Sequence, residues 1–295
     1  MTRLLLLGAG GQVGREIAAL APGRVPGLVA LDRAGLDITD APALDAALAA
    51  HRPDVVINAA GYTAVDRAES EPEAAHLINA VAPGRIAAAC ARHGARLIHI
   101  STDYVFDGTK AGAYVEDDPV APLGVYGISK EAGERAVRER LDAHLIVRTS
   151  WVYGIHGANF LKTMLRLARE RDRLTVVADQ KGCPTATVDV AEGLLAAAVA
   201  LHEGRMAPGT YHLAGTGATS WYGFARAIIE RAAAHTGRRP EIVPIATADY
   251  PTPARRPANS ELSSEKLAQA IGFRAAPWEP RAAGVVDQIL ATSAT

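Results

Sequence analysis

Short apolar runs alternate with longer stretches of helical periodicity through the first half of the chain. The apolar runs occupy residues 3–7, 28–32, 54–58, 96–101 and 144–150. Apolar residues recur at helical spacing between them, over 13–21, 42–51, 71–92 and 126–140. Continuous apolar strands separated by helices are typical of βαβ units. The pattern therefore predicts an α/β fold with a Rossmann-type, doubly wound parallel sheet.

The second half is less regular, which indicates a smaller C-terminal α/β domain. Helical patterns cover 158–171, 187–201 and 221–235, and strand-like runs cover 174–178, 210–214 and 241–245. Prolines at 251–257 predict an extended loop, because proline disfavours helix at its own and the preceding position. We expect residues 1–152, with returning segments near 174–201 and 210–215, to form a dinucleotide-binding domain. The remaining segments of 153–295 would form a substrate-binding domain.

Composition narrows the class of protein. The 295 residues are 49% hydrophobic and 21% charged, with a net charge of −1, so no strong field is available for nucleic acid or an anionic membrane. No apolar run approaches the roughly 18–20 residues of a membrane span. Cys90 and Cys183 are far apart and have no metal-ligand spacing, which favours a reducing compartment. We therefore expect a cytoplasmic protein that binds neither nucleic acid nor membrane.

Three glycines follow the first predicted strand and open the first predicted helix. Gly8, Gly11 and Gly14 give G-x-x-G-x-x-G, whereas the G-x-G-x-x-G spacing is absent because Val13 occupies its sixth position. Small residues let the backbone approach a pyrophosphate, and the new helix offers free N–H groups. The turn therefore predicts a dinucleotide site, although tight packing alone also explains such glycines.

Asp32 and Arg33 close the second predicted strand and point to different cofactors. A carboxylate at Asp32 would accept hydrogen bonds from the adenosine ribose of NADH, whereas Arg33 would pair with the 2′-phosphate of NADPH. A solvated Asp–Arg pair is the alternative. Adenine would rest near Asp37 and Ile38, which follow a short extended segment. NADH and NADPH both stay open.

Hydroxyl, phenol and amine groups provide the candidate chemistry. Ser101, Thr102 and Asp103 end a strand, and Tyr126 and Lys130 lie one helical turn apart. We expect Lys130 to lower the phenol pKa, ordinarily about 10, by roughly 1–3 units and to bind the nicotinamide ribose. Tyr126 would then protonate a substrate oxygen that Thr102 holds; we prefer Thr102 to Ser101 because strand residues alternate faces. A tyrosine packed on a lysine stem is the alternative.

Motifs along almost the whole chain resemble one family. They include "GAGGQVG", "NAAGYTAVDRAESEP", "STDYVFDG", "VYGISKEAGE", "RTSWVYG", "NFLKTMLRLA", "DQKGCPT" and "YPTPARRPANSEL". The chain resembles the extended short-chain dehydrogenase/reductases and, among them, the dTDP-4-dehydrorhamnose reductase family. The resemblance implies Thr102, Tyr126 and Lys130 as catalytic residues, Gly11, Gln12 and Val13 at the pyrophosphate, Asp32, Asp37 and Ile38 around the adenosine, Gly61, Tyr62 and Thr63 along the cofactor, and Asp103 and Trp151 at the sugar nucleotide.

The same resemblance implies reduction of the C4 ketone of dTDP-4-dehydro-L-rhamnose by NADPH or NADH to dTDP-L-rhamnose. Trp151 would pack on the deoxysugar, or lie between the two halves, and Arg255 and Arg256 would pair with the substrate diphosphate. Glu16 is a weak candidate for a Mg²⁺ ligand in a homodimer. Two alternatives remain: a sugar-nucleotide epimerase or dehydratase that retains NAD, and a non-catalytic regulatory subunit of the methionine adenosyltransferase type.

Overall fold

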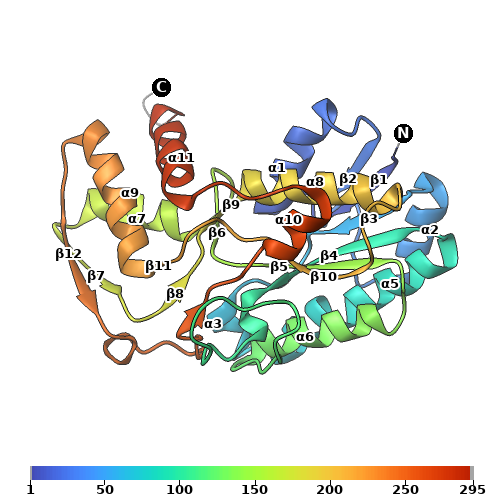
Figure 1. Ribbon diagram of the computed structural model, residues 1–295, viewed down its shortest axis with the longest axis horizontal. Coiled ribbons are helices and arrows are strands. Elements are labelled where there is room, and N and C mark those ends of the chain that lie inside the picture. The colour runs from blue at the N-terminus through green and yellow to red at the C-terminus, as the bar shows by residue number, and fades with distance from the viewer. Residues whose placement is uncertain (1, 293–295) are drawn as a thin grey trace.

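A six-stranded parallel sheet forms the centre of the larger half of the protein (Figure 1). The computed structural model describes residues 2–292. The strands are β1 (Leu4–Leu7), β2 (Leu28–Leu31), β3 (Val55–Asn58), β4 (Arg96–Thr102), β5 (His144–Thr149) and β10 (Gly209–His212). Their order is β10-β5-β4-β3-β1-β2, and every neighbouring pair is parallel.

Helices cover both faces of this sheet, as Figure 1 shows. Helices α1 (Gln12–Leu20) and α8 (Thr187–His202) pack on one face, and α2 (Ala41–His51), α5 (Ala82–His93) and α6 (Val125–Arg138) on the other. Alternation along β1 divides its leucines: Leu4 and Leu6 enter the first core, and Leu5 and Leu7 enter the second. The predicted doubly wound α/β fold is therefore confirmed.

A further core lies in the second half of the chain. Helices α7 (Phe160–Glu170), α9 (Trp221–Thr236) and α11 (Trp278–Thr292) surround it, and β7 (Arg173–Val177) pairs with β12 (Glu241–Ile245) at its edge. Shorter elements complete this half: β6 (Val152–Tyr153), β8 (Lys181–Gly182), β9 (Thr185–Ala186), β11 (Thr219–Ser220), β13 (Asn259–Ser260) and α10 (Glu265–Ile271). Figure 1 shows α7, α9 and α11 apart from the parallel sheet.

The structure differs from the predicted elements in three places. The helix expected over 71–92 is divided into α4 (Pro72–His76), a π-helical turn (Leu77–Val81) and α5, and a short α3 (Val65–Ala68) precedes it. Helices α10 and α11 were not predicted. The segment 174–201 divides, because β7 pairs with β12 while α8 covers the main sheet; the boundary between the two domains stays a prediction.

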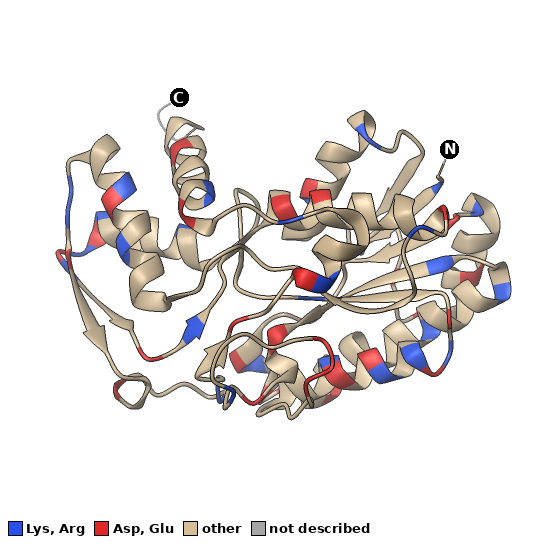
Figure 2. Cartoon of the chain, in the orientation of Figure 1, with Lys and Arg blue, Asp and Glu red and all other residues tan. Residues whose placement is uncertain are grey.

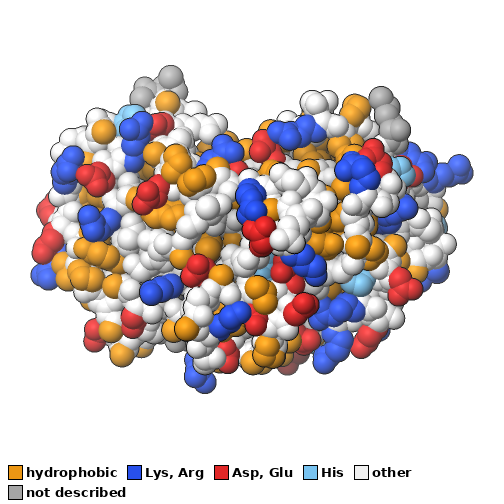
Figure 3. All heavy atoms as spheres, in the orientation of Figure 1, with side chains coloured by type: hydrophobic (Ala, Val, Ile, Leu, Met, Phe, Trp, Pro, Cys, Tyr) orange, Lys and Arg blue, Asp and Glu red, His pale blue; other side chains and the backbone are white. Residues whose placement is uncertain are grey.

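Charged and apolar side chains are mixed over the surface. Figure 2 shows basic and acidic residues interspersed in both halves, and Figure 3 shows a hollow in the outline between α1 and α11. Within residues 2–292, no helix is long and apolar enough to cross a membrane.

Candidate active site

The predicted cofactor and catalytic residues gather at the carboxyl edge of the parallel sheet. The glycine turn follows β1, Asp32 follows β2, Gly61 follows β3, Thr102 ends β4 and Trp151 follows β5. Strand β1 lies between β2 and β3, so the chain passes from β1 to β2 on one side and then crosses back to β3 on the other side. Ligands of doubly wound folds bind in the crevice at such a reversal of strand order.

The structure gives a different reason for glycine at each of the three positions of the turn. Gly8 has a φ of +84°, and a Cβ there would lie 2.5 Å from the backbone nitrogen of Ala60. A Cβ on Gly14 would lie 2.2 Å from the Gly8 carbonyl oxygen, so both positions require glycine for packing. Gly11 is exposed and would allow a Cβ, with Gly8 O at 3.4 Å as its nearest contact. No side chain caps α1 at Gly11, so its first N–H groups fit a pyrophosphate.

Gln12 connects the glycine turn to the second half of the protein. Its Oε1 accepts a hydrogen bond from Asn159 Nδ2 at 3.0 Å. The Asn159 Oδ1 in turn accepts the Lys162 N–H at 3.1 Å and caps α7. Val13 is half-buried against the core. Asn159 was not singled out from the sequence, although asparagine two residues after Gly157 is a recognisable helix-capping signal.

The adenosine end contains charged groups of both signs. Asp32 is exposed and its Oδ1 accepts two backbone N–H groups of the following turn, each at 3.0 Å. Arg33 is exposed and forms no salt bridge with any described residue. Hydrogen bonds from Thr39, and then the charge of Arg33, lower the pKa of Asp37. Ile38 is buried in the core beneath this edge. The structure keeps Asp32 and Arg33 both accessible, so NADH and NADPH both fit.

Asn79 connects the predicted cofactor loop to α6, the candidate catalytic helix, which contains Tyr126 and Lys130. It is fully buried in the π-helical turn, a feature frequent at functional sites. Its Oδ1 accepts the Tyr62 N–H at 2.8 Å, and its Nδ2 donates to Tyr62 O at 2.9 Å and to Ser129 Oγ at 3.0 Å. Gly61 and Thr63, on either side of Tyr62, are exposed. Asn79 therefore fixes the loop Gly61–Thr63 relative to α6.

Tyr126 and Thr102 lie together, but the electrostatics differ from the sequence prediction. Burial raises the pKa of Tyr126 to about 12, and a hydrogen bond with the Thr102 hydroxyl opposes part of the rise. The Tyr126 ring stands edge-on to Tyr104, with centroids 5.5 Å apart. The predicted decrease in this pKa is wrong for the protein without ligands, because desolvation outweighs any stabilisation of the phenolate. Tyr126 is therefore a protonated phenol at neutral pH.

Lys130 is directed at the backbone of β4. It is 5% exposed, and its Nζ donates to Ile100 O at 2.6 Å and lies 3.5 Å from His99 Nε2. Burial lowers the pKa of Lys130 to about 8, while the charge of Glu134 opposes the shift. The roles of Lys130 toward Tyr126 and the nicotinamide ribose stay predictions.

Two carboxylates hold α6, the candidate catalytic helix, in place. Gly124 at the start of α6 has no capping side chain, and Glu69 Oε1 instead accepts the Val125 N–H at 2.9 Å. Further along α6, the fully buried Glu134 accepts two hydrogen bonds from Arg148 of β5, at 2.7 and 2.9 Å. Neither Glu69 nor Glu134 was predicted from the sequence, because each partner lies far away along the chain.

Asp103 is a buried carboxyl group beside Thr102. Its Oδ1 accepts the Thr102 hydroxyl at 2.9 Å, whereas Oδ2 has no hydrogen-bond partner among the described residues. Burial raises the pKa of Asp103 to about 6, and the nearby Ser260 and Thr102 hydroxyls oppose the shift. An unpaired buried oxygen beside the candidate catalytic hydroxyl fits the predicted substrate contact.

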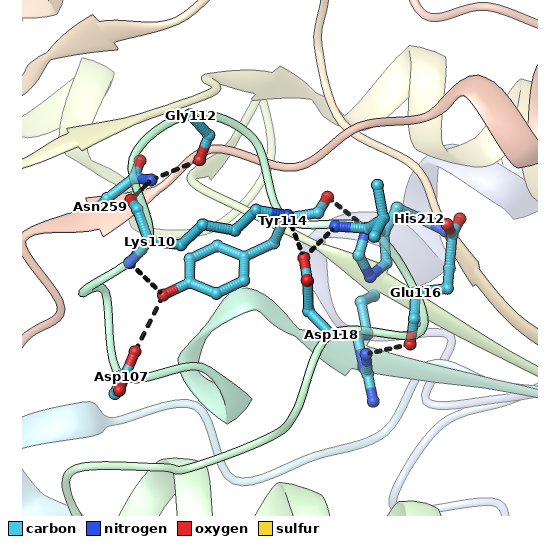
Figure 4. Close-up of polar contacts among 10 residues, drawn as sticks. Asp107, Lys110, Gly112, Tyr114, Glu116, Asp118, His212 and Asn259 are labelled. Atoms are coloured by element: carbon cyan, nitrogen blue, oxygen red, sulfur yellow. Dashed lines mark hydrogen bonds and ion pairs between the residues drawn. The ribbon is translucent and has the colours of Figure 1, made fainter.

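Figure 4 shows how the loop between β4 and α6 is fastened to the C-terminal segment. Asn259 Nδ2 donates to the carbonyl oxygens of Lys110 and Gly112 at 2.8 and 2.7 Å. The Tyr114 hydroxyl donates to Asp107 at 2.9 Å within the loop. These bonds place the residue after Asn259, which is Ser260, close to Asp103. Asn259 lies in the quoted motif "YPTPARRPANSEL", so the sequence marked its segment without indicating its role.

Trp151 stacks on a second tryptophan. The Trp151 and Trp221 rings are parallel within 8°, with centroids 3.5 Å apart, and a Cβ on Gly182 would lie 2.4 Å from the Trp151 ring. Trp151 also has a φ of +47°, which is uncommon for a residue other than glycine. Gln180 accepts the Trp221 indole N–H at 3.2 Å. The ring of Trp151 therefore packs in a fixed orientation against residues of the second half, and both of its predicted roles stay predictions.

The two arginines of the proline-rich loop differ in their partners. Arg256 forms two hydrogen bonds to Asp66 of α3, at 2.8 and 3.0 Å, and these lower the pKa of Asp66. Its guanidinium group thus joins the loop to the first half of the chain. Arg255 is exposed and forms no salt bridge with any residue from 2 to 292, so it is the freer candidate for a diphosphate.

Glu16 has a protein partner in this structure. Its Oε2 accepts the Thr187 hydroxyl at 2.8 Å, across the contact of α1 with α8. In the described part of the chain, no three His, Cys, Asp or Glu side chains form a potential metal site. Glu16 as a Mg²⁺ ligand in a dimer stays a prediction.

The parallel sheet, the open glycine turn and the Thr102–Tyr126–Lys130 arrangement define a Rossmann-type reductase of the short-chain dehydrogenase/reductase class. The sequence model of a family described as "RmlD substrate binding domain" matches residues 1–291. A dTDP-4-dehydrorhamnose reductase of Burkholderia thailandensis is 47% identical over 94% of this chain and 95% of its own length. The chain belongs to the dTDP-4-dehydrorhamnose reductase family.

Solved structures agree with this assignment. A crystal structure of a dTDP-4-dehydrorhamnose reductase from Clostridium acetobutylicum superimposes with a TM-score of 0.91 at 38% identity, covering 97% of this chain and 99% of that one. One from Bacillus anthracis, in complex with NADP, has a TM-score of 0.88 at 35% identity, with the same coverage of 97% and 99%.

Proposed function

We propose that this protein reduces the C4 ketone of dTDP-4-dehydro-L-rhamnose, with NADPH or NADH, to give dTDP-L-rhamnose. One observation supports this above all: a protonated, half-buried phenol and a threonine hydroxyl meet at the carboxyl edge of the sheet, the same edge from which α1 starts with no side-chain cap. The family relatives named as dTDP-4-dehydrorhamnose reductases support the choice of substrate. The complex of the Bacillus anthracis relative with NADP supports the choice of cofactor.

The dinucleotide would lie across the N-terminus of α1. Gly11 and the first N–H groups of α1 would hold the pyrophosphate, Asp32 or Arg33 the adenosine ribose, and the loop Gly61–Thr63 the middle of the cofactor. Lys130 would bind the nicotinamide ribose. When bound, the reduced nicotinamide supplies the hydride that is added to the substrate carbon.

Tyr126 would supply the proton. Hydride addition to a ketone carbon leaves negative charge on the carbonyl oxygen, and the phenol O–H of Tyr126 protonates this oxygen while the Thr102 hydroxyl holds it. An alkoxide is far more basic than a phenolate, so the transfer is downhill even though the pKa of Tyr126 is about 12. A phenol with a high pKa is also fully protonated at neutral pH, as the reductive direction requires.

The substrate would extend into the second half of the protein. Asp103 would accept a hydrogen bond from the sugar through its unpaired Oδ2, Trp151 would pack on the deoxysugar, and Arg255 would face the diphosphate. Arg256 would contribute by holding the proline-rich loop against α3 rather than by releasing Asp66. We also propose a cytoplasmic location, since both cysteines are buried and free. The homodimer that the resemblance implies stays a prediction.

A coupled assay tests the proposal. The protein is mixed with dTDP-4-dehydro-6-deoxyglucose, the 3,5-epimerase and NADPH or NADH, and nicotinamide absorbance is followed. We expect oxidation of one NAD(P)H for each dTDP-rhamnose formed. Isomerisation without net oxidation would support the NAD-retaining epimerase or dehydratase instead. No turnover, together with binding to a methionine adenosyltransferase, would support the regulatory subunit.

A further inference from the structure

A buried pair of side chains lies behind Lys130, and the proposed reaction does not use it. Asn58 ends β3 and His99 lies on β4, and both are fully buried. Asn58 Nδ2 is 3.1 Å from His99 Nδ1, and His99 Nε2 is 3.5 Å from Lys130 Nζ, at the outer limit of hydrogen bonding. The three side chains therefore connect the end of β3 with α6 through two successive polar contacts.

The backbone determines which His99 nitrogen carries the proton. Asn58 Oδ1 accepts the Ala60 N–H at 3.1 Å, and this bond fixes the orientation of the amide. The Asn58 NH₂ group, which can only donate, therefore faces His99 Nδ1, so Nδ1 must be the acceptor. Burial and the charge of Lys130 hold the pKa of His99 well below its usual range. A neutral His99 then carries its proton on Nε2, which faces Lys130.

This tautomer matters for Lys130 because an ammonium group has donors and no acceptor. An Nε2–H facing an ammonium group places donor against donor. A neutral amine, in contrast, can accept Nε2–H through its lone pair while it donates to Ile100 O at 2.6 Å. The geometry therefore favours the neutral amine, in the same direction as burial, which lowers the pKa of Lys130 to about 8.

We propose that the Asn58–His99 pair is a positioning device that favours the neutral amine of Lys130 in the cofactor-free protein, so that above about pH 8 dinucleotide binding draws a proton from solvent onto Lys130. The inference rests on the proposed function, because it takes NADPH or NADH as the ligand. A ribose hydroxyl offers the ammonium an acceptor and a diphosphate offers it negative charge, so both favour the charged form. The step adds one H⁺ to one amine, and no other bond changes.

The other titratable groups around Lys130 ionise outside the relevant range of pH. The pKa of Asp103, after β4, is raised to about 6, and that of Tyr126, one turn earlier on α6, to about 12. Glu134, one turn later on α6, has a lowered pKa because Arg148 donates to it. Among these groups, Lys130 is therefore the one whose pKa lies between neutral pH and the pKa of Tyr126.

Cofactor affinity measured against pH tests the linkage without substrate. NADPH and NADH are titrated by fluorescence from about pH 7 to 9.5, above the phosphate pKa of about 6, and NADH lacks the 2′-phosphate altogether. We expect Kd to be constant near pH 7 and to rise above pH 8 by a factor that approaches ten per pH unit. Calorimetry in buffers of different ionisation enthalpy should show proton uptake on binding in this range. Lys130→Met should abolish both effects.

Two variants distinguish the effect of the Asn58–His99 pair on the pH dependence from that of Lys130 itself. In His99→Gln, the amide oxygen can turn toward the ammonium, and in Asn58→Asp the carboxylate would accept Nδ1–H and leave Nε2 as an acceptor. Both should raise the pKa of Lys130, so that the rise in Kd begins about one pH unit higher, which means up to tenfold tighter binding than wild type at alkaline pH. Nitrogen NMR of His99 should report Nε2–H in wild type and Nδ1–H in Asn58→Asp. The control is His144→Gln, which replaces a buried histidine at the first position of β5, and this variant should behave as wild type.

The outcomes distinguish this inference from the proposed function. An Nδ1–H tautomer in wild type, a pH-independent Kd in wild type, or an unshifted profile in both His99→Gln and Asn58→Asp would overturn the inference. Retention of the pH dependence in Lys130→Met would also overturn it. If one variant fails to fold, the other variant and the wild-type NMR tautomer still decide. Failure of wild type to bind either dinucleotide at any pH would instead refute the proposed function.

Discussion

Replacing Asp103 with Asn should stabilise the protein at neutral pH. Asp103 is 2% exposed, its Oδ2 has no partner among the described residues, and burial raises its pKa from 3.8 to about 6. The folded protein therefore binds this proton more tightly than the unfolded chain does. Asp103 contributes its full stabilisation of the folded state below the pKa of the unfolded chain, and this stabilisation is lost as pH rises through about 6. A shift of two pKa units corresponds to about 3 kcal/mol, which Asn, being uncharged, would not lose.

The assay is urea unfolding of wild type and Asp103→Asn at two pH values. We expect the variant to be more stable by roughly 2–3 kcal/mol at about pH 7.5, and the difference to shrink to roughly 1 kcal/mol or less near pH 4.5. Reductase activity should fall, because the predicted sugar contact is lost. Asp54→Asn is the control of opposite sign, since hydrogen bonds from Arg3 lower the pKa of Asp54 to about 2. That variant should be less stable than wild type at neutral pH, with a difference that closes in acid. An Asp103→Asn variant no more stable than wild type, or a gap independent of pH, would refute the reasoning.

Three further predictions concern the catalytic helix and its supports. Tyr126→Phe should lower kcat by a factor on the order of 10²–10⁴ while NADPH affinity stays the same, and normal turnover would show that Tyr126 is not the proton donor. Asn79→Leu removes three hydrogen bonds and should lower the free energy of unfolding, measured by urea titration, by roughly 2–3 kcal/mol. The same variant should weaken NADPH binding, measured by fluorescence, because the loop that contains Tyr62 loses its support. Unchanged NADPH affinity would show that Asn79 does not position this loop for the cofactor. Glu134→Ala leaves the buried Arg148 unpaired and should cost about 3–5 kcal/mol, whereas a cost below 1 kcal/mol would mean that water reaches Arg148.

The main sheet could be predicted because its strands are continuous apolar runs, which only burial on both faces explains. Helix α11 was missed although its signal is present. Trp278, Ala282, Val286 and Leu290 are buried at a spacing of four residues. Pro280 and the glycine at 284 lower helix propensity within the same stretch, and packing against α9 outweighs that cost. The periodicity of the buried positions was therefore the usable signal for this helix.

The site was predictable where chemistry lies in short local motifs, and not where it depends on contacts between distant segments. The glycine turn and the Tyr126–Lys130 spacing are local and were found. The bond of Asn79 to Tyr62 and the stacking of Trp151 on Trp221 join residues that only the folded chain brings together. Spacing gives no information about which residues meet across such distances, so these supports could not be inferred from one sequence.

The direction of the pKa shift of Tyr126 has a consequence for the mechanism. Spacing placed a cation near the phenol, but burial moves both groups toward their neutral forms: it raises the pKa of Tyr126 and lowers that of Lys130. A neutral phenol beside a neutral amine is a poor proton donor, because no charge stabilises the phenolate that it would leave. Above about pH 8, where Lys130 of the empty site is largely neutral, the proposed uptake of a proton on dinucleotide binding would form the cation only once the hydride source is present. The same burial that opposes catalysis in the empty site would then make proton donation depend on the cofactor.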